Sequence, residues 1–333
     1  MQNPELFKEF KSLKTQSETS NAFDVIPIHN TNHKLGISKE GYPKFFVCTD
    51  DGICPTKNTY LEILSVEYNL PCTFVSDNEQ TEKHQYSVIT LRSKDESLQS
   101  DFIDIFVLML SRLKAIPTKK EIAMEVENLI SIFTAMKCPR RKPVQGLWAE
   151  LLVIERSNDP ETLVKAWHQE PNAKYDFTLG RDKIEVKSTS GEERKHHFSL
   201  DQLNPTKHSR LVIASTIVRE SGQGNGGCSV RDLYNKICPR ISSVEQRLRL
   251  YEVIVETLGA EFQSADNLFF DYVSGCDSLK YYDYRDVPGV DKESLDIGVS
   301  SVGFDSTLPE DMDINSSKSH FDGYDSVLFK CTL

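Results

Sequence analysis

The fold is decided by residues 175–187, which read YDFTLGRDKIEVK. In the second half of this stretch, apolar and polar residues alternate with the period of two that is typical of a half-buried β-strand. Ile184 and Val186 therefore point to the buried side, while Glu185 and Lys187 point to the other side. The stretch predicts a strand whose second face is polar.

The middle of the stretch predicts a tight turn. Gly180-Arg181 can form a two-residue loop, with Gly at the first central position as a type II′ turn requires. The resulting register sets Phe177 opposite Ile184 and Asp176 opposite Glu185, so two carboxylates face each other. Like charges in this arrangement repel unless a counter-ion is supplied. A three-residue loop would shift the register by one residue and separate the two acids.

Two facing carboxylates suit a hard divalent cation. Magnesium prefers oxygen ligands and keeps coordination positions open for water and a phosphate, as phosphodiester chemistry requires. Lys187, two residues after Glu185 on the same face, would lie beside the attacking water. The alternative interpretation is a surface hairpin with ordinary charged residues, because strands commonly carry alternating charge.

A third acid precedes the hairpin. Residues 146–155 read GLWAELLVIE and predict a helix that is apolar on nearly all sides, so it should be buried against a sheet. Glu150 and Glu155 both fall between apolar neighbours on the helical wheel, so either could be a partly buried carboxylate. The spacing leaves the choice between them open.

Four segments together resemble the PD-(D/E)XK nuclease superfamily, and most closely its bacterial branch found among restriction and phage-defence genes. The likeness is strongest over about residues 140–220 and extends more loosely over most of the chain. Tyr175 replaces the proline of the name-giving motif, a change that many members tolerate. The four segments are Gln145–Leu151, Tyr175–Phe177, Ile184–Thr189 and His197–Leu203.

This resemblance implies a fold and a set of roles. The fold is α/β (α+β), with a restriction-endonuclease-like core made of a helix and a mixed four- to five-stranded sheet. Glu150, Asp176 and Glu185 would position Mg²⁺, with Mn²⁺ as a substitute and the Val186 carbonyl as a further ligand. Lys187 would orient or activate water.

Two further residues are implied as helpers of the site. In the family, the His-x-x-x-x-Gln-Leu segment borders the active site, which points to DNA contacts for His197 and Gln202. The alternative is that the histidine pair entering an apolar run is structural or solvated. No histidine has a partner at zinc-ligand spacing, so zinc is not expected.

Composition limits the class of protein. The chain has 333 residues and 38% hydrophobic content, enough to fill a substantial core. Its eight cysteines include no Cys-x-x-Cys pair, and the N-terminus is too charged for a secretory signal, so we expect reduced thiols in the cytoplasm. The longest apolar run, residues 102–110, is far shorter than a membrane span, so no membrane association is expected.

The net charge of −11 argues against a dedicated DNA binder, but its distribution softens this objection. Residues 137–210 carry 14 Lys or Arg against 11 Asp or Glu, whereas the rest of the chain carries 25 against 39. Positive charge therefore collects around the proposed site. A patch of this size predicts modest, salt-sensitive affinity for DNA.

The chain reads as three regions. Residues 1–136 predict an antiparallel β-rich region followed by two helices, residues 137–240 the nuclease-like core, and residues 241–333 a C-terminal helix with further strands. The boundary segment 137–143, with two prolines and several basic residues, is either a solvated linker or a phosphate contact. The glycine-rich segment 222–227 predicts a flexible hairpin or binding loop, because no Gly-Lys-Ser/Thr follows it.

Patterning within these regions predicts the individual elements. Ser243 and Gln246 form a capping box for a helix that ends near Leu258, with Gly259 as its C-cap. Other helices are expected near residues 4–14, 98–113, 119–136, 199–203 and 230–237, and strands near 23–28, 45–48, 61–67, 86–92, 196–198, 211–218, 268–273, 279–284 and 299–304.

The leading functional prediction is a Mg²⁺-dependent DNA endonuclease, a deoxyribonuclease that hydrolyses phosphodiester bonds in restriction-modification or antiviral defence. Cutting both strands would require a homodimer or another defence-system protein. The alternative is a catalytically silent nuclease-fold subunit that binds DNA or partner proteins in a defence complex, although the presence of all four motif side chains argues against it. A third interpretation is an acidic adaptor whose hairpin charges are accidental.

Overall fold

The computed structural model describes residues 4–15, 23–50, 57–75, 81–170, 173–296 and 298–333. The chain divides into two compact units, Met1–Ala135 and Met136–Leu333. The boundary lies directly before the basic, proline-containing segment 137–143. Each unit has its own sheet and its own buried core.

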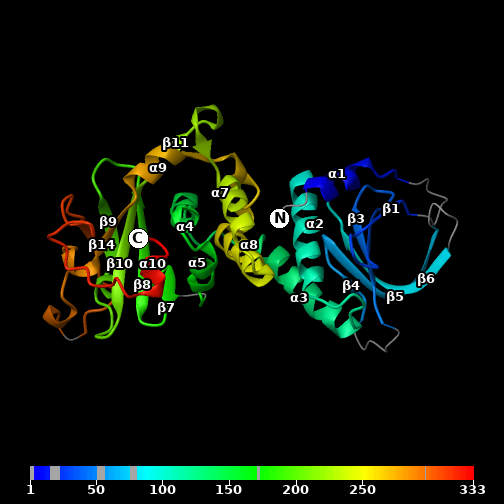
Figure 1. Cartoon of the computed structure of the whole chain (residues 1–333), viewed down its shortest axis with the longest axis horizontal. Coiled ribbons are helices and arrows are strands. Elements are labelled where there is room, and N and C mark those ends of the chain that lie inside the picture. The colour runs from blue at the N-terminus through cyan, green and yellow to red at the C-terminus, as the bar shows by residue number, and fades with distance from the viewer. Residues whose placement is uncertain (1–3, 16–22, 51–56, 76–80, 171–172, 297) are drawn as a thin grey trace. The chain divides into compact units, whose positions relative to one another are not determined.

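The first unit is a six-stranded antiparallel sheet with helices on one face (Figure 1). Neighbouring residues of a strand point to opposite faces, and the two adjacent phenylalanines of β3 show this. The ring of Phe45 lies 4.7 Å from that of Phe106 in α2, whereas Phe46 packs against Phe74 on the other face. The elements are α1 (Pro4–Ser12), β1 (Val25–Pro27), β2 (Lys34–Ile37), β3 (Pro43–Cys48), β4 (Thr59–Tyr60), β5 (Leu64–Val75), β6 (Thr81–Leu91), α2 (Glu96–Ser111) and α3 (Lys119–Ala135), with sheet order β1-β2-β3-β6-β5-β4.

The second unit is built on a four-stranded mixed sheet in the order β14-β10-β8-β7. Strand β10 runs parallel to β8, while β7 and β14 are antiparallel to their neighbours. This confirms the predicted α/β class with a mixed sheet. The strands are β7 (Phe177–Leu179), β8 (Asp182–Thr189), β10 (Arg210–Ile217) and β14 (Lys280–Asp283).

The β7–β8 hairpin has the predicted register. Phe177 pairs with Ile184, and Leu179 pairs with Asp182 across the two-residue loop. Gly180 has a φ of +59°, which a glycine adopts without steric cost and which the first position of a type II′ turn needs. The turn therefore fixes which residues of the two strands face each other.

Both faces of this sheet are covered. Helix α4 (Val144–Arg156) packs on β8, and Figure 1 shows α4 and α5 (Pro160–Ala166) beside the sheet. The opposite face carries a cluster that includes Phe198, Ile213 and Tyr282. That cover comes from β9 (Lys195–Ser199), which pairs with β15 (Gly303–Thr307), and from α6 (Leu200–Leu203). The polar face of β8 is therefore buried as well.

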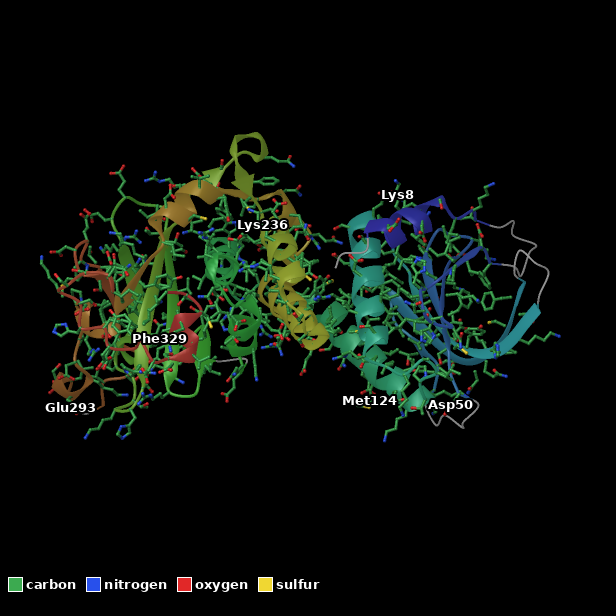
Figure 2. The ribbon with its side chains drawn as sticks, in the orientation of Figure 1. Lys8, Asp50, Met124, Lys236, Glu293 and Phe329 are labelled. Carbon is green, nitrogen blue, oxygen red and sulfur yellow. The ribbon has the colours of Figure 1, made fainter. Side chains whose placement is uncertain are left out.

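The C-terminal region belongs to the same compact unit. Residues 241–333 supply β14 to the sheet and helix α8 (Val244–Leu258), so the part predicted as a third region does not stand apart from the core. Phe329 of α10 (Val327–Lys330), labelled in Figure 2, is fully buried. The remaining elements are α7 (Val230–Ile237), α9 (Tyr272–Ser278) and a small sheet of β11 (Glu220–Ser221), β12 (Gly227–Cys228) and β13 (Phe269–Asp271).

Two predicted strands differ in extent. The strand expected over 268–273 is β13 alone, because Asp271 accepts a hydrogen bond from the backbone N–H of Ser274 and so begins α9. The strand expected over 299–304 is β15, shifted toward the C-terminus by its pairing with β9. Across the described part of the chain, no helix combines the length and the apolar character needed to cross a bilayer.

Candidate functional site

Three elements of the second unit bring three acids together. Glu150 comes from α4, Asp176 stands directly before β7, and Glu185 lies in β8. Their exposed fractions are 3%, 5% and 4%, so all three carboxylates are buried. Buried acids are unusual unless they are paired or bind a cation, which marks this cluster as a candidate site.

Glu150 is fully paired. Its Oε1 accepts a hydrogen bond from Lys142 Nζ at 2.7 Å. Its Oε2 lies 2.7 Å from the indole Nε1 of Trp167 and 2.8 Å from His168 Nε2. The helix thus carries a carboxylate that is held in place from two sides.

Asp176 connects this helix to the hairpin. Its Oδ1 accepts from Lys142 Nζ at 2.6 Å, and its Oδ2 accepts from the backbone N–H of Val186 at 2.8 Å. The backbone N–H of His168 donates to the carbonyl oxygen of Asp176. Ligand atoms of Glu150, His168 and Asp176 all lie within 4.8 Å of one another, a spacing at which they could share a metal ion.

Glu185 is paired through one oxygen only. Its Oε1 accepts from Lys187 Nζ at 2.9 Å and from the side-chain amide of Gln202. Lys187 Nζ also donates to Gln202 Oε1 at 3.2 Å and lies 4.9 Å above the ring of Phe198. Among the described residues, no atom forms a hydrogen bond with the buried Oε2 of Glu185.

The charges in the cluster are not balanced. Burial, followed by the negative charge of Asp176, raises the pKa of Glu185 to about 8. Burial and the charge of Glu150 also raise the pKa of Asp176. Burial pushes the pKa of Glu150 upward too, but the hydrogen bond with His168 and the charge of Lys142 outweigh it and hold that pKa at about 2. Burial and negatively charged neighbours therefore disfavour the ionised forms of both Asp176 and Glu185.

The structure resolves the choice between the two helix acids. Glu150 faces Asp176, whereas Glu155 is only half-buried and accepts a hydrogen bond from the Tyr272 hydroxyl at 2.9 Å. Both acids have apolar neighbours on the helix, so only the docking of α4 against β8 separates them. Of the two, Glu150 is the acid that shares Lys142 with Asp176.

The two predicted helpers have different surroundings. Gln202 is close to the site, because its amide bridges Glu185 and Lys187 while a capping box with Ser199 holds its backbone. The side chain of His197 is 71% exposed and lies 3.0 Å from Asp305. The structure therefore brings Gln202, but not His197, to the acid cluster.

Sequence reasoning missed Lys142, Trp167 and His168. Lys142 belongs to the basic run that was interpreted as a linker or a phosphate contact, and its Nζ lies 3.3 Å from His168 Nε2. His168 is distant in sequence from both acids, so no metal-ligand spacing reveals it. Its φ of +39°, uncommon for a non-glycine residue, appears only in the structure.

A divalent cation fits these residues. The donor set consists of the carboxylates of Glu150 and Asp176 with one imidazole nitrogen, and among the described residues a buried oxygen of Glu185 has no hydrogen-bond partner. Oxygen-rich ligand sets select Mg²⁺ or Mn²⁺, and a nitrogen donor is tolerated better by Mn²⁺. The zinc ligand pattern of several Cys or His residues is not met by this group.

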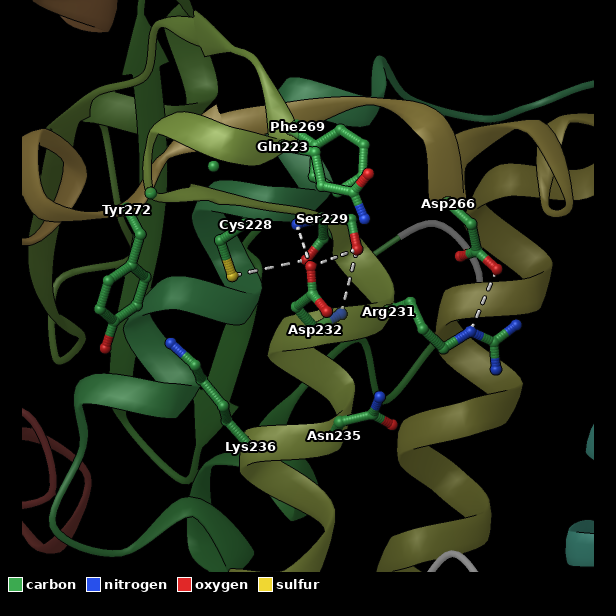
Figure 3. A pocket seen from close by; sticks show the side chains of 12 residues that line it. Gln223, Cys228, Ser229, Arg231, Asp232, Asn235, Lys236, Asp266, Phe269 and Tyr272 are labelled. Atoms are coloured by element: carbon green, nitrogen blue, oxygen red, sulfur yellow. Dashed lines mark hydrogen bonds and ion pairs between the residues drawn. The ribbon is translucent and has the colours of Figure 1, made fainter. Parts of the chain in front are cut away.

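A pocket of about 740 Å³ opens beside Lys142 and His168. Arg141 and Arg249 also line it, and the Arg249 guanidinium donates to the His168 carbonyl oxygen. A second pocket of about 630 Å³ is lined by none of the three acids and by none of the residues that contact them (Figure 3). There Ser229 and Asp232 cap α7, and Arg231 lies 3.2 Å from Asp266. The first pocket is therefore the one that borders the acid cluster.

The raised pKa of Glu185 predicts a specific pH dependence of stability. The folded protein retains a proton on Glu185 up to about pH 8, whereas the unfolded chain releases it near 4.5. This contribution to stability is therefore complete below about pH 4.5 and is lost as the pH rises through about 8. In urea denaturation with a chelator present, Glu185→Gln should gain stability over the wild type progressively across that range. Parallel pH profiles for the two proteins would contradict this.

Comparison with known families gives one match. The family model described as "Putative PD-(D/E)XK family member (DUF4420)" matches residues 6–309. This range covers most of both units and every residue of the acid cluster. No curated protein and no solved structure matches the chain.

Proposed function

Because the chain belongs to this PD-(D/E)XK family, we propose that it is a metal-dependent DNA endonuclease. The observation that carries the proposal is the unpaired, buried Oε2 of Glu185 beside a second buried carboxylate, Asp176. Burying Glu185 with one unpaired oxygen near the charge of Asp176 costs free energy. A cation that binds both acids would offset that cost and supply the chemistry.

The chain's own residues have distinct roles in this proposal. Asp176 and Glu185 would hold Mg²⁺ or Mn²⁺, with Glu150 and the Val186 carbonyl completing the ligand set. Lys187, fixed by Glu185 and Gln202, would position the attacking water and contact the phosphate. When bound, the metal ion polarises the scissile phosphate and lowers the pKa of a coordinated water.

Gln202 would act through the residues it touches. Its amide nitrogen donates to Glu185 and its oxygen accepts from Lys187, so one side chain sets the direction of both. Ser199 and Gln202 cap α6 reciprocally, and this restricts the movement of Gln202. We therefore assign Gln202 a positioning role. The exposed His197 is left as a candidate for a DNA contact at the rim.

A cellular role in restriction or phage defence, in the cytoplasm, follows from the family resemblance alone and is proposed on that basis. Cleavage of both strands would need a second copy of the chain or another defence-system protein. The alternative function is a silent nuclease-fold subunit that binds DNA or partner proteins. The ammonium of Lys142 favours it, because that charge already lies between two of the acids.

The decisive experiment compares two glutamates of one helix. Purified protein is incubated with modified and unmodified circular DNA in Mg²⁺, Mn²⁺ or chelator. Glu150→Gln should lower the cleavage rate by roughly 10- to 100-fold, because it removes one ligand or ligand-supporting group. Glu155→Gln, the matched control, should cleave at the wild-type rate, since Glu155 contacts Tyr272 instead.

The outcomes separate the two functions. Cleavage that needs metal and falls only in Glu150→Gln supports the enzyme. DNA binding without cleavage in either metal supports the silent subunit. Equal losses in Glu150→Gln and Glu155→Gln would show that the helix acids act through folding, and would remove the support for this site.

A further inference from the structure

We propose that Lys142 is a resident cation of this centre: its ammonium holds Glu150 and Asp176 together and is exchanged for the divalent metal ion when the centre is loaded. The inference rests on the proposed function and deepens it. It assigns control of the metal affinity to Lys142, which is neither one of the three motif acids nor the motif lysine.

The ammonium of Lys142 lies where a shared metal ion would lie. Its Nζ is 2.7 Å from Glu150 Oε1, 2.6 Å from Asp176 Oδ1 and 3.3 Å from His168 Nε2. These are the three side chains whose ligand atoms are close enough to share one ion. Lys142 and a metal ion therefore compete for the same oxygen atoms.

Charge counting favours the exchange. The three acids Glu150, Asp176 and Glu185 carry three negative charges when ionised, and Lys142 and Lys187 supply two positive ones. A divalent ion in place of the Lys142 ammonium supplies the missing charge. Once Glu185 is ionised, the exchange thus neutralises a buried cluster that the two lysines leave with one negative charge.

The exchange needs only side-chain movement. The backbone before Lys142 is tied to the end of α8, where Arg141 N–H donates to the Thr257 carbonyl and Ala260 N–H donates to the Cys138 carbonyl. The Lys142 side chain is 36% exposed and borders the 740 Å³ pocket, so its flexible stem has a path to solvent. Glu150 and Asp176 stay buried throughout.

The first test uses the wild-type protein. Amine acylation is followed by mass spectrometry at Lys142, with the exposed Lys207 as the internal reference, with and without saturating Mn²⁺. An ammonium in two ion pairs is protected, so the Lys142 labelling rate should rise severalfold when Mn²⁺ binds, while Lys207 is unchanged. Mn²⁺ binding, measured by calorimetry, without faster Lys142 labelling would overturn the inference and leave the nuclease proposal standing.

The second test measures metal affinity in the absence of DNA. Lys142→Met keeps an unbranched stem but removes the competing charge, so its Kd for Mn²⁺ should fall by about tenfold or more. Arg141→Met is the control, because it removes the same charge one residue away while its own partner is the exposed Glu256. Equal Kd values for the two variants would overturn the inference.

The two tests cover the case of a poorly folded variant. If Lys142→Met does not fold in chelator, the wild-type labelling experiment decides alone. If neither protein binds Mn²⁺ although both are folded, the inference and the nuclease proposal fail together. If Mn²⁺ binding disappears in Asp176→Asn, but Mn²⁺ does not speed the labelling of Lys142 in the wild type, the metal site stands and only the proposed exchange is wrong.

Discussion

Asp176→Asn is expected to lower metal-dependent DNA cleavage by roughly 10³-fold while the protein stays folded. Asp176 is the acid that interacts both with Lys142 and with the strand that carries Glu185. It accepts from Lys142 with one oxygen and from the Val186 N–H with the other, and its charge raises the pKa of Glu185. An amide is a much weaker metal ligand than a carboxylate, so both metal binding and water activation should be lost.

The same substitution should cost little stability. The pKa of Asp176 is raised by burial and by Glu150, so its charged form is disfavoured in the folded protein. A neutral asparagine removes that repulsion, and the melting temperature in chelator should stay equal to or exceed that of the wild type. Stability given up for chemistry in this way is a common feature of active sites.

The control for Asp176→Asn is an exposed aspartate in the same unit. Asp311 pairs with Lys318 at the surface, so Asp311→Asn should retain both cleavage and stability. Cleavage rates are measured on circular DNA in Mn²⁺ and melting by circular dichroism. Asp176→Asn with more than a tenth of the wild-type rate, or with a strongly lowered melting temperature, would contradict the proposed metal-binding role.

The hairpin could be predicted because its determinants are local. The glycine at position 180 selects a two-residue turn, the turn fixes the register, and the register pairs Phe177 with Ile184, the chain neighbours of Asp176 and Glu185. Helix α7 was also predicted over its full extent, 230–237. Its start is set by the capping box of Ser229 and Asp232, which lies within four residues of sequence.

The rest of the centre depends on tertiary packing. The helical wheel gives Glu150 and Glu155 similar apolar neighbours, and only the face that docks on β8 decides which acid is buried in the site. His168 reaches Glu150 because α5 packs between α4 and β7, an arrangement with no signature in spacing. Lys142 lies in a segment without regular structure, where a linker and a ligand look alike in sequence.

Glu185 illustrates a third kind of limit. Alternation placed it on a polar face, and the structure buries it because β9 and α6 cover that face. The sequence indicates a strand at 196–198 and a short helix at 199–203, but it does not indicate the face of the sheet on which they pack. The burial and the raised pKa of Glu185 could therefore only be found from the structure.

Gly259→Ala is expected to destabilise the protein by about 3 kcal/mol or more, which lowers the melting temperature of a unit of this size by roughly 6–12 °C. Gly259 ends α8 with a φ of +52°, a conformation that is strained for alanine. A Cβ at this position would also lie 2.1 Å from the Cys138 carbonyl oxygen. That oxygen is backbone and accepts the hydrogen bond from Ala260, so no side chain can move aside.

Gly226→Ala separates the two causes. Gly226 also has a positive φ, +76°, but an added Cβ would meet nothing within 4 Å, so this variant should lose only about 1 kcal/mol from backbone strain. The difference between the two variants measures the contact of the α8 end with the segment that carries Lys142. Because that contact fixes the backbone from which Lys142 reaches the acids, Gly259→Ala should also accelerate acylation of Lys142, and Gly226→Ala should not. Equal loss of stability in both variants, with unchanged Lys142 labelling, would show that the end of α8 does not position this lysine.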